Sequence, residues 1–205
     1  MTDADFLAQR TEYWARTLTA IPSITGSADE AEFSHRLVSL LKDSPAFSGR
    51  RDAVWTVPVP GGLYPRSCVL ALASGAGRRT VVLTGHFDIV ETSGYGRLEH
   101  LALRPDQLGA ALVDQIAAEP FDARSARAHD DLSGGDFLAG RGLLDMKGGL
   151  AAGLAVIEAI TRAQSFDGNL LFIAVPDEEG NSAGARRMAQ ALGGIATELR
   201  LDIEA

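Results

Sequence analysis

The sequence predicts an α/β protein with three layers, in which one β-sheet lies between helices on both faces. Short segments rich in β-forming residues alternate along the chain with longer segments of helical periodicity. One short segment, residues 169–175, is apolar throughout and is followed by Pro176, which is typical of a strand covered on both faces. These observations favour a layered sheet over an all-helical bundle.

Two helices are predicted before the first strand. Residues 5–20 carry apolar side chains at helical spacing, and Pro22 follows them. Ser27 and Glu30 match the capping-box pattern that begins a second helix. The apolar residues of this second helix fall on one face and are Phe33, Leu37, Leu40 and Leu41.

The remaining chain alternates between predicted strands and helices. After Lys147 no charge occurs until Glu158, so residues 147–160 are predicted to form a buried helix. A further helix is expected to end at Gly193, because glycine commonly follows the last helical residue. The predicted strands are residues 53–59, 67–73, 80–84 and 169–175, and the last helix covers residues 183–192.

Residues 92–136 fit this alternation less well. They combine a helical segment at residues 105–118 with a polar stretch at 122–136, and we interpret them as a surface insertion. Residues 199–205 alternate between apolar and polar side chains, as a strand does, and no turn follows them. We therefore expect residues 1–205 to form one partial domain with an insertion at about 92–136.

The composition excludes several classes of protein. A net charge of −8 provides no positive field for nucleic acid, and no apolar run is long enough to span a membrane. Cys68 is the single cysteine, so a metal site would have nitrogen and oxygen ligands, and Cys68 itself is expected to be buried. The N-terminus has no signal-peptide pattern, and a cytoplasmic protein is expected.

The first motif is Gly85-His86-Phe87-Asp88, directly after a predicted strand. A histidine at a strand end can reach the crevice above a sheet, and a carboxylate two residues later lies on the same side of extended chain. Such a carboxylate can hold one imidazole nitrogen while the other binds a metal ion. A hydrogen-bonded surface histidine would give the same pattern.

The second motif is the glycine-rich segment 140–149, which contains Asp145 before the predicted buried helix. Its glycines permit a tight turn, and an acid at this position could bridge two cations. A helix-capping aspartate would also explain the residue. A phosphate-binding loop explains the segment less well, because neither of the common glycine-rich nucleotide motifs is present.

The third motif, Asp177-Glu178-Glu179-Gly180, follows the apolar strand 169–175. Three consecutive acids at the mouth of a sheet repel one another unless a cation is present. Neighbouring side chains of extended chain point in opposite directions, so one glutamate could bind metal while the other faces the reacting water. An ordinary acidic loop is the alternative. We expect all three motifs to meet at the carboxyl ends of strands.

The three motifs in this order resemble those of the zinc aminoacylase and carboxypeptidase family that includes acetylornithine deacetylase and succinyl-diaminopimelate desuccinylase. Residues 21–26 are similar to the N-terminal segment of that family, so the resemblance covers nearly the whole chain. It implies the N-terminal part of a di-zinc exopeptidase catalytic domain, with two zinc ions in the intact site and cobalt or manganese as substitutes. His86 would bind one ion, Asp145 would bridge both, Glu179 would bind the second, Glu178 would be the general base, and Asp88 would orient His86.

The chain departs from this family in two respects. The connection between Asp88 and Asp145 is longer than usual and resembles the arginine-utilisation branch. The family's second acidic ligand, its late histidine and its lid domain are not recognised, and Asp202 and Glu204 are not assigned as ligands. We therefore expect an incomplete site that is inactive in the isolated chain, and a homodimer only where a lid domain is present.

The expected function is metal-dependent hydrolysis of amide bonds in N-acyl amino acids or small peptides. The alternative is a noncatalytic relative that serves as a binding or assembly module. A nucleotide-binding α/β domain is disfavoured because its phosphate loop is missing. Neither nucleic acid nor a membrane is expected as a partner.

Overall fold

The computed structural model describes residues 3–118, 122–163 and 166–203. These residues form a five-stranded sheet with the strand order β1-β2-β4-β3-β5. Strands β1 and β2 and strands β2 and β4 pair antiparallel, whereas β3 pairs parallel with both β4 and β5. The strands are β1 (Val54–Val59), β2 (Arg66–Ser74), β3 (Arg79–His86), β4 (Asn169–Val175) and β5 (Asp202–Ile203).

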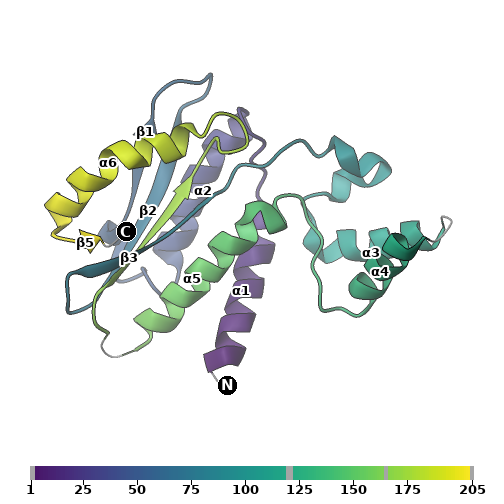
Figure 1. The fold of residues 1–205 in the computed structure, drawn as a ribbon, viewed down its shortest axis with the longest axis horizontal. Helices are drawn as coiled ribbons and strands as arrows, with labels where there is room; N and C mark the ends of the chain where they lie inside the picture. Colours follow the sequence, from purple (N-terminus) through teal and green to yellow (C-terminus); the bar gives the residue numbers. More distant parts are fainter. Residues whose placement is uncertain (1–2, 119–121, 164–165, 204–205) are drawn as a thin grey trace.

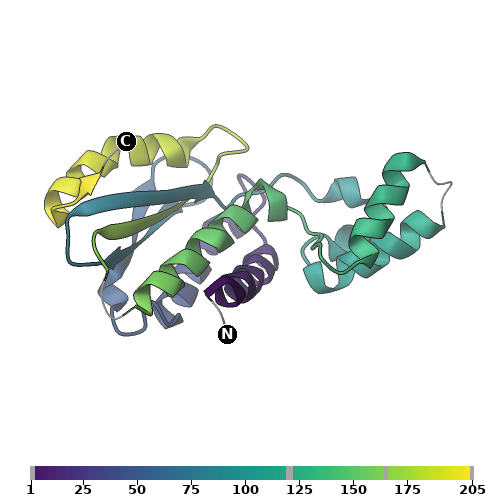
Figure 2. The same cartoon turned by 60° about the horizontal axis from the view of Figure 1, so that its bottom comes forward.

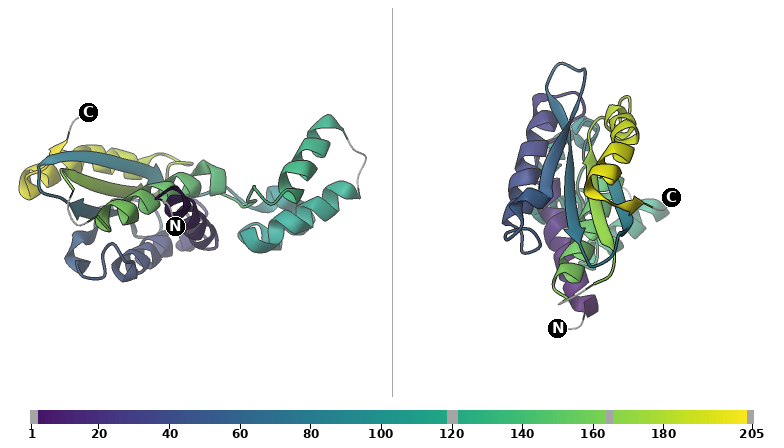
Figure 3. Two further views of the ribbon diagram at one scale, coloured as in Figure 1. Left: turned by 90° about the horizontal axis from the view of Figure 1, so that it is seen from below. Right: turned by 90° about the vertical axis from the view of Figure 1, so that its left-hand side faces the viewer.

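Helices cover both faces of the sheet, so the predicted fold class is confirmed (Figure 1; Figure 3). One core cluster joins the sheet to α1, α2 and α5 and includes Trp14, Phe33 and Phe172, all at most 2% exposed. A second cluster joins the opposite face to α6 and includes Leu70 and Met188. The helices are α1 (Asp3–Thr19), α2 (Ala28–Asp43), α5 (Gly148–Thr161) and α6 (Ala183–Leu199).

The end of α6 was predicted wrongly. The helix continues through Gly193 and Gly194 to Leu199, because Leu192 and Ile195 on either side of the glycines pack against the second core cluster. Tertiary packing of this kind overrides the low helix propensity of glycine. The helix ends instead at Arg200, which adopts a left-handed conformation with φ 55°.

The strand predicted at residues 199–205 is also shorter than expected. Only Asp202 and Ile203 pair with β3, because Leu199 belongs to α6 and Leu201 packs in the second core cluster. The remainder of that prediction, residues 204–205, lies outside the described residues.

Residues 93–133 form a helical arm that extends away from the sheet (Figure 1; Figure 2). The arm consists of η2 (Ser93–Leu101), α3 (Pro105–Ala117) and α4 (Ala123–Ser133). The sequence predicted α3 but missed α4, whose residues are too polar to show an apolar face, and α4 has no buried residue. Asp122 caps α4, because its carboxylate accepts a hydrogen bond from Ser125 N at 2.7 Å.

No helix within the described ranges is long and apolar enough to cross a membrane.

Cys68 lies fully buried in β2, as expected, and its thiol donates to the main-chain oxygen of Gly184 at 3.6 Å. Burial raises the pKa of Cys68 to about 12. At pH 8 the thiolate fraction of the folded protein is then about one part in 10⁴, far below that of an exposed cysteine.

We expect an aromatic disulfide reagent to leave Cys68 unmodified in native buffer and to label it at once in guanidinium chloride. Rapid labelling of the folded chain would contradict this placement.

Candidate metal centre

Two of the three sequence motifs meet because β3 and β4 run parallel. His86 is the last residue of β3 and lies opposite Val175, the last residue of β4. The segment that follows β4 therefore begins beside the imidazole. This edge is the carboxyl end of both strands, where open α/β sheets collect their ligands, as the sequence predicted.

Asp145 reaches the same place from a different element. It lies in the short π-helical turn η3 (Leu143–Lys147) ahead of α5, so the expectation that all three motifs follow strands was wrong for this one. The glycines around Asp145 do permit close packing. A Cβ atom on Gly142, whose φ is 72°, would lie 2.1 Å from Ile89 Cγ2, and one on Gly148 would lie 2.6 Å from Leu143 O.

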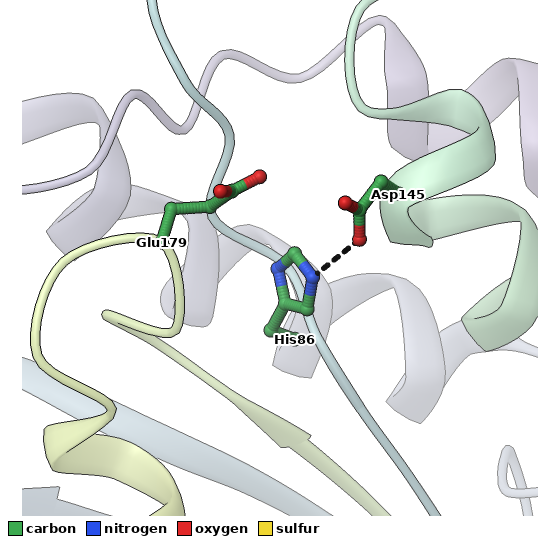
Figure 4. Close-up of side chains that lie close together, drawn as sticks. All are labelled: His86, Asp145 and Glu179. Atoms are coloured by element: carbon green, nitrogen blue, oxygen red, sulfur yellow. Dashed lines mark hydrogen bonds and ion pairs between the residues drawn. The ribbon is translucent and has the colours of Figure 1, made fainter.

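His86, Asp145 and Glu179 converge (Figure 4). Each offers one metal-binding atom, and these atoms lie within 4.8 Å of one another. His86 Nε2 lies 2.9 Å from Asp145 Oδ1, and Glu178 Oε2 lies 3.7 Å from the same nitrogen. The imidazole is 4% exposed, whereas the Asp145 carboxylate is 76% exposed. One buried base thus faces three carboxylates that are open to solvent.

Asp88 contacts the imidazole of His86 and also holds the segment after β4 in place. His86 Nδ1 is 3.0 Å from the main-chain oxygen of Asp88 but 3.5 Å from its carboxylate. That carboxylate accepts hydrogen bonds from the main-chain N–H groups of Glu178 and Glu179, at 3.0 and 3.1 Å, and from the Thr25 hydroxyl at 2.9 Å. A proton on Nδ1 leaves Nε2 free to face the carboxylates.

Burial and neighbouring charges shift the pKa values of the site. Burial would lower the pKa of His86, but hydrogen bonds to Asp88 and Asp145 raise it to about 9. Burial and the neighbouring Asp145 carboxylate raise the pKa of Glu179. Burial opposes ionisation of Asp88, yet its hydrogen bonds, led by that of His86, keep its pKa below the usual range. The site therefore concentrates negative charge and holds His86 as its nearby counter-charge.

The sequence motifs did not reveal two buried charges beside the site. Lys147 is fully buried, donates to Ile21 O at 2.7 Å, and lies 4.7 Å from the centre of the Phe33 ring. Burial lowers the pKa of Lys147 to about 7. Asp177, the first acid of its motif, turns inward to Arg66, with Arg66 Nη1 2.6 Å from Asp177 Oδ1. No local pattern distinguished Asp177 from its two neighbours.

The unassigned Asp202 does not lie at this site. It belongs to β5, which pairs with Arg79 and Thr80 at the opposite end of β3 from His86, and it forms an exposed ion pair with Arg78 at 2.9 Å. Glu204 lies outside the described residues.

Residues 112–204 match the model of the peptidase family M20/M25/M40. The uncharacterized protein YqjN of Bacillus subtilis is 37% identical over 177 residues, which cover 86% of this chain and 31% of that protein. Protein RocB of the same organism is 27% identical over 197 residues, covering 95% of this chain and 34% of RocB. The chain thus spans about a third of the length of these relatives.

Solved structures support the same fold. The dipeptidase Dug1p of Saccharomyces cerevisiae matches with a TM-score of 0.58 and 14% identity, over 92% of this chain and 36% of that one. The M20 family metallo-carboxypeptidase Sso-CP2 of Sulfolobus solfataricus matches with a TM-score of 0.55 and 15% identity, over 82% of this chain and 31% of that one. The match of residues 112–204 to the family model and the relatives in sequence support the peptidase family M20/M25/M40, and the solved structures show the shared fold.

We expect Asp88→Asn to destabilise the fold, because an amide group cannot accept hydrogen bonds from every donor that the carboxylate serves. A donor left without an acceptor costs about 1–3 kcal/mol of the free energy of unfolding. Urea denaturation measures this loss. The control is Asp167→Asn, which alters an exposed ion pair with Arg79 and should change stability by less than about 0.5 kcal/mol. Equal unfolding midpoints for the two variants would contradict the role of Asp88.

Proposed function

We propose that this chain supplies the metal centre of a hydrolase that cleaves amide bonds in N-acyl amino acids or small peptides. The observation that carries the proposal is the convergence of His86, Asp145 and Glu179 within 4.8 Å. The match of residues 112–204 to a peptidase family model supports the reaction class. The dipeptidase and the metallo-carboxypeptidase with this fold support a small substrate.

The donor set suits a borderline divalent cation. One imidazole nitrogen and two carboxylates match catalytic zinc, which generally has three protein ligands and an open position, and cobalt and manganese accept similar donors. In the proposed two-ion arrangement both ions would share Asp145, with His86 as a ligand of one and Glu179 as a ligand of the other, so these residues would supply two ligands to each ion. The bound metal would supply a Lewis acid that polarises the scissile carbonyl and lowers the pKa of water.

Glu178 is the proposed general base. Its carboxylate is 49% exposed and lies on the same side of the imidazole as the converging ligands, 3.7 Å from His86 Nε2. It can accept a proton from the attacking water and return that proton to the leaving amine, since one carboxylate can serve both steps in turn. Asp88 fixes the backbone of Glu178 and Glu179, so the base and the ligand keep their relative positions.

We expect Glu179→Gln and Asp145→Asn each to weaken zinc binding by the 205-residue chain by at least about tenfold, because each loses a charged ligand. Isothermal titration calorimetry with zinc gives both the affinity and the number of ions. The control is Glu32→Gln, which changes an exposed glutamate on α2 and should leave the titration unaltered. Zinc binding that is unchanged in all three variants would refute the ligand assignment.

We expect Glu178→Gln to leave zinc affinity within about twofold of the unmodified protein and to lower turnover by about 10²- to 10⁴-fold, the usual contribution of a general base. Release of amine from N-acyl amino acids and dipeptides measures turnover, in a polypeptide that contains residues 1–205 and shows metal-dependent activity. If Glu178→Gln lost zinc while Glu179→Gln lost only turnover, the two roles would be reversed. Zinc binding without amine release in any such polypeptide would favour the noncatalytic binding module.

A further inference from the structure

Every polar atom of Asp177 forms a hydrogen bond or an ion pair, although Asp177 is not one of the converging ligands. Its backbone adopts a left-handed conformation with φ 66°, which is uncommon for a residue other than glycine. Its main-chain oxygen accepts from Asn181 N and Ser182 N, and its Oδ2 atom accepts from Ala183 N at 3.1 Å. Its Oδ1 atom and its N–H group bind two side chains from other elements.

The first of these side chains is Glu30, from the first turn of α2. Glu30 is fully buried, and its Oε1 atom accepts from Asp177 N at 2.7 Å. The sequence predicted a capping box in which Glu30 would bond back to Ser27. Ser27 does cap the helix, but Glu30 Oε2 accepts from Gly26 N at 2.8 Å. The other oxygen of Glu30 accepts from the N–H group of Asp177, which lies 147 residues later in the sequence. A local capping role therefore does not account for Glu30.

The second side chain is Arg66, the first residue of β2. Its Nη1 atom lies 2.6 Å from Asp177 Oδ1 and 3.4 Å from Glu30 Oε2, and the residue is 8% exposed. One guanidinium thus lies between two buried carboxylates. The same Arg66 nitrogen contacts both carboxylates, so the positive charge of the guanidinium reduces the repulsion between them. The three side chains come from α2, β2 and the end of β4.

This buried network sets the direction of the chain where the candidate site begins. Because φ is positive at Asp177, the chain turns sharply after β4, and the next two N–H groups both donate to Asp88 beside His86. Glu178 and Glu179 are consequently fixed on one side by Asp88 and on the other by the anchored Asp177. We propose that Glu30 and Arg66 are positioning residues, which act through Asp177 to hold the general base and the metal ligand in place. The inference rests on the function proposed above.

The experiment compares Glu30→Gln and Arg66→Met with Glu32→Gln, which makes the same chemical change as the first variant at an exposed site of the same helix. Hydrogen–deuterium exchange by mass spectrometry measures the protection of residues 177–183, β4 and α5, and calorimetry measures zinc affinity. We expect exchange in residues 177–183 to rise by about tenfold or more, with β4 and α5 unchanged. Zinc affinity should fall by about 10- to 100-fold, as is typical when a residue that supports a metal ligand is removed.

The inference is overturned if Glu30→Gln and Arg66→Met match Glu32→Gln in both measurements. Where either variant raises exchange throughout the chain, Asp177→Asn decides. Asparagine tolerates the left-handed conformation, and its one side-chain oxygen can still accept from Ala183 N, whereas the charge and the acceptor paired with Arg66 are lost. An increase confined to residues 177–183 supports the inference, and unchanged exchange there refutes it. If the unmodified chain binds no zinc, the proposed function fails, whereas the exchange data still decide whether Glu30 and Arg66 hold the turn.

Discussion

The candidate site depends on one buried carboxylate. Asp88 is fully buried, and the hydrogen bonds that keep it ionised come from the segment after β4, from Thr25 in the connection between α1 and α2, and from His86 beside it. Hydrogen bonds to an ionised acceptor are stronger than those between neutral groups. Because the donors belong to segments distant in the sequence, the site forms only when the fold brings these segments together. An unpaired carboxylate at the same place would destabilise the protein instead.

Two neighbouring networks divide the acidic residues of this edge into different roles. Asp177 and Glu30 point into the protein and share Arg66, whereas Asp145, Glu178 and Glu179 are exposed and lie beside His86. In the inward group Arg66 offsets one of the two carboxylate charges, and main-chain N–H groups donate to the carboxylate oxygens. The exposed group keeps an excess of negative charge, which a divalent cation would offset. The candidate metal centre is therefore formed by the acids whose charge the protein does not pair with an arginine.

Local patterns in the sequence predicted strands β1 to β4 and most of the helices, and the resemblance to a known family singled out the three converging residues. Apolar runs mark β3 and β4, and the acids and the histidine stand at their ends. Local spacing could not separate Asp177 from Glu178, since the difference is the contact of Asp177 with Arg66, 111 residues away. Nor could it show that Gly193 lies inside a helix, because packing of α6 on the sheet decides that boundary. Both failures concern contacts between distant segments, which no local spacing encodes.

The helical arm shows how a long insertion can enter this fold without displacing the site. The chain enters the arm after Ile89 and returns at Gly142, and these two residues lie against each other. Ile89 forms a β-bridge with Ile24 and packs against Gly142, which holds the two ends at the body of the protein. Arg141 contacts the arm instead, because its N–H group donates to Ala102 O and its guanidinium lies over the Tyr95 ring. With its two ends held together, lengthening the arm adds little entropic cost, because loop-closure entropy grows only with the logarithm of length. The spacing between Asp88 and Asp145 is therefore free to vary, whereas the turn around Gly142 that presents Asp145 is not.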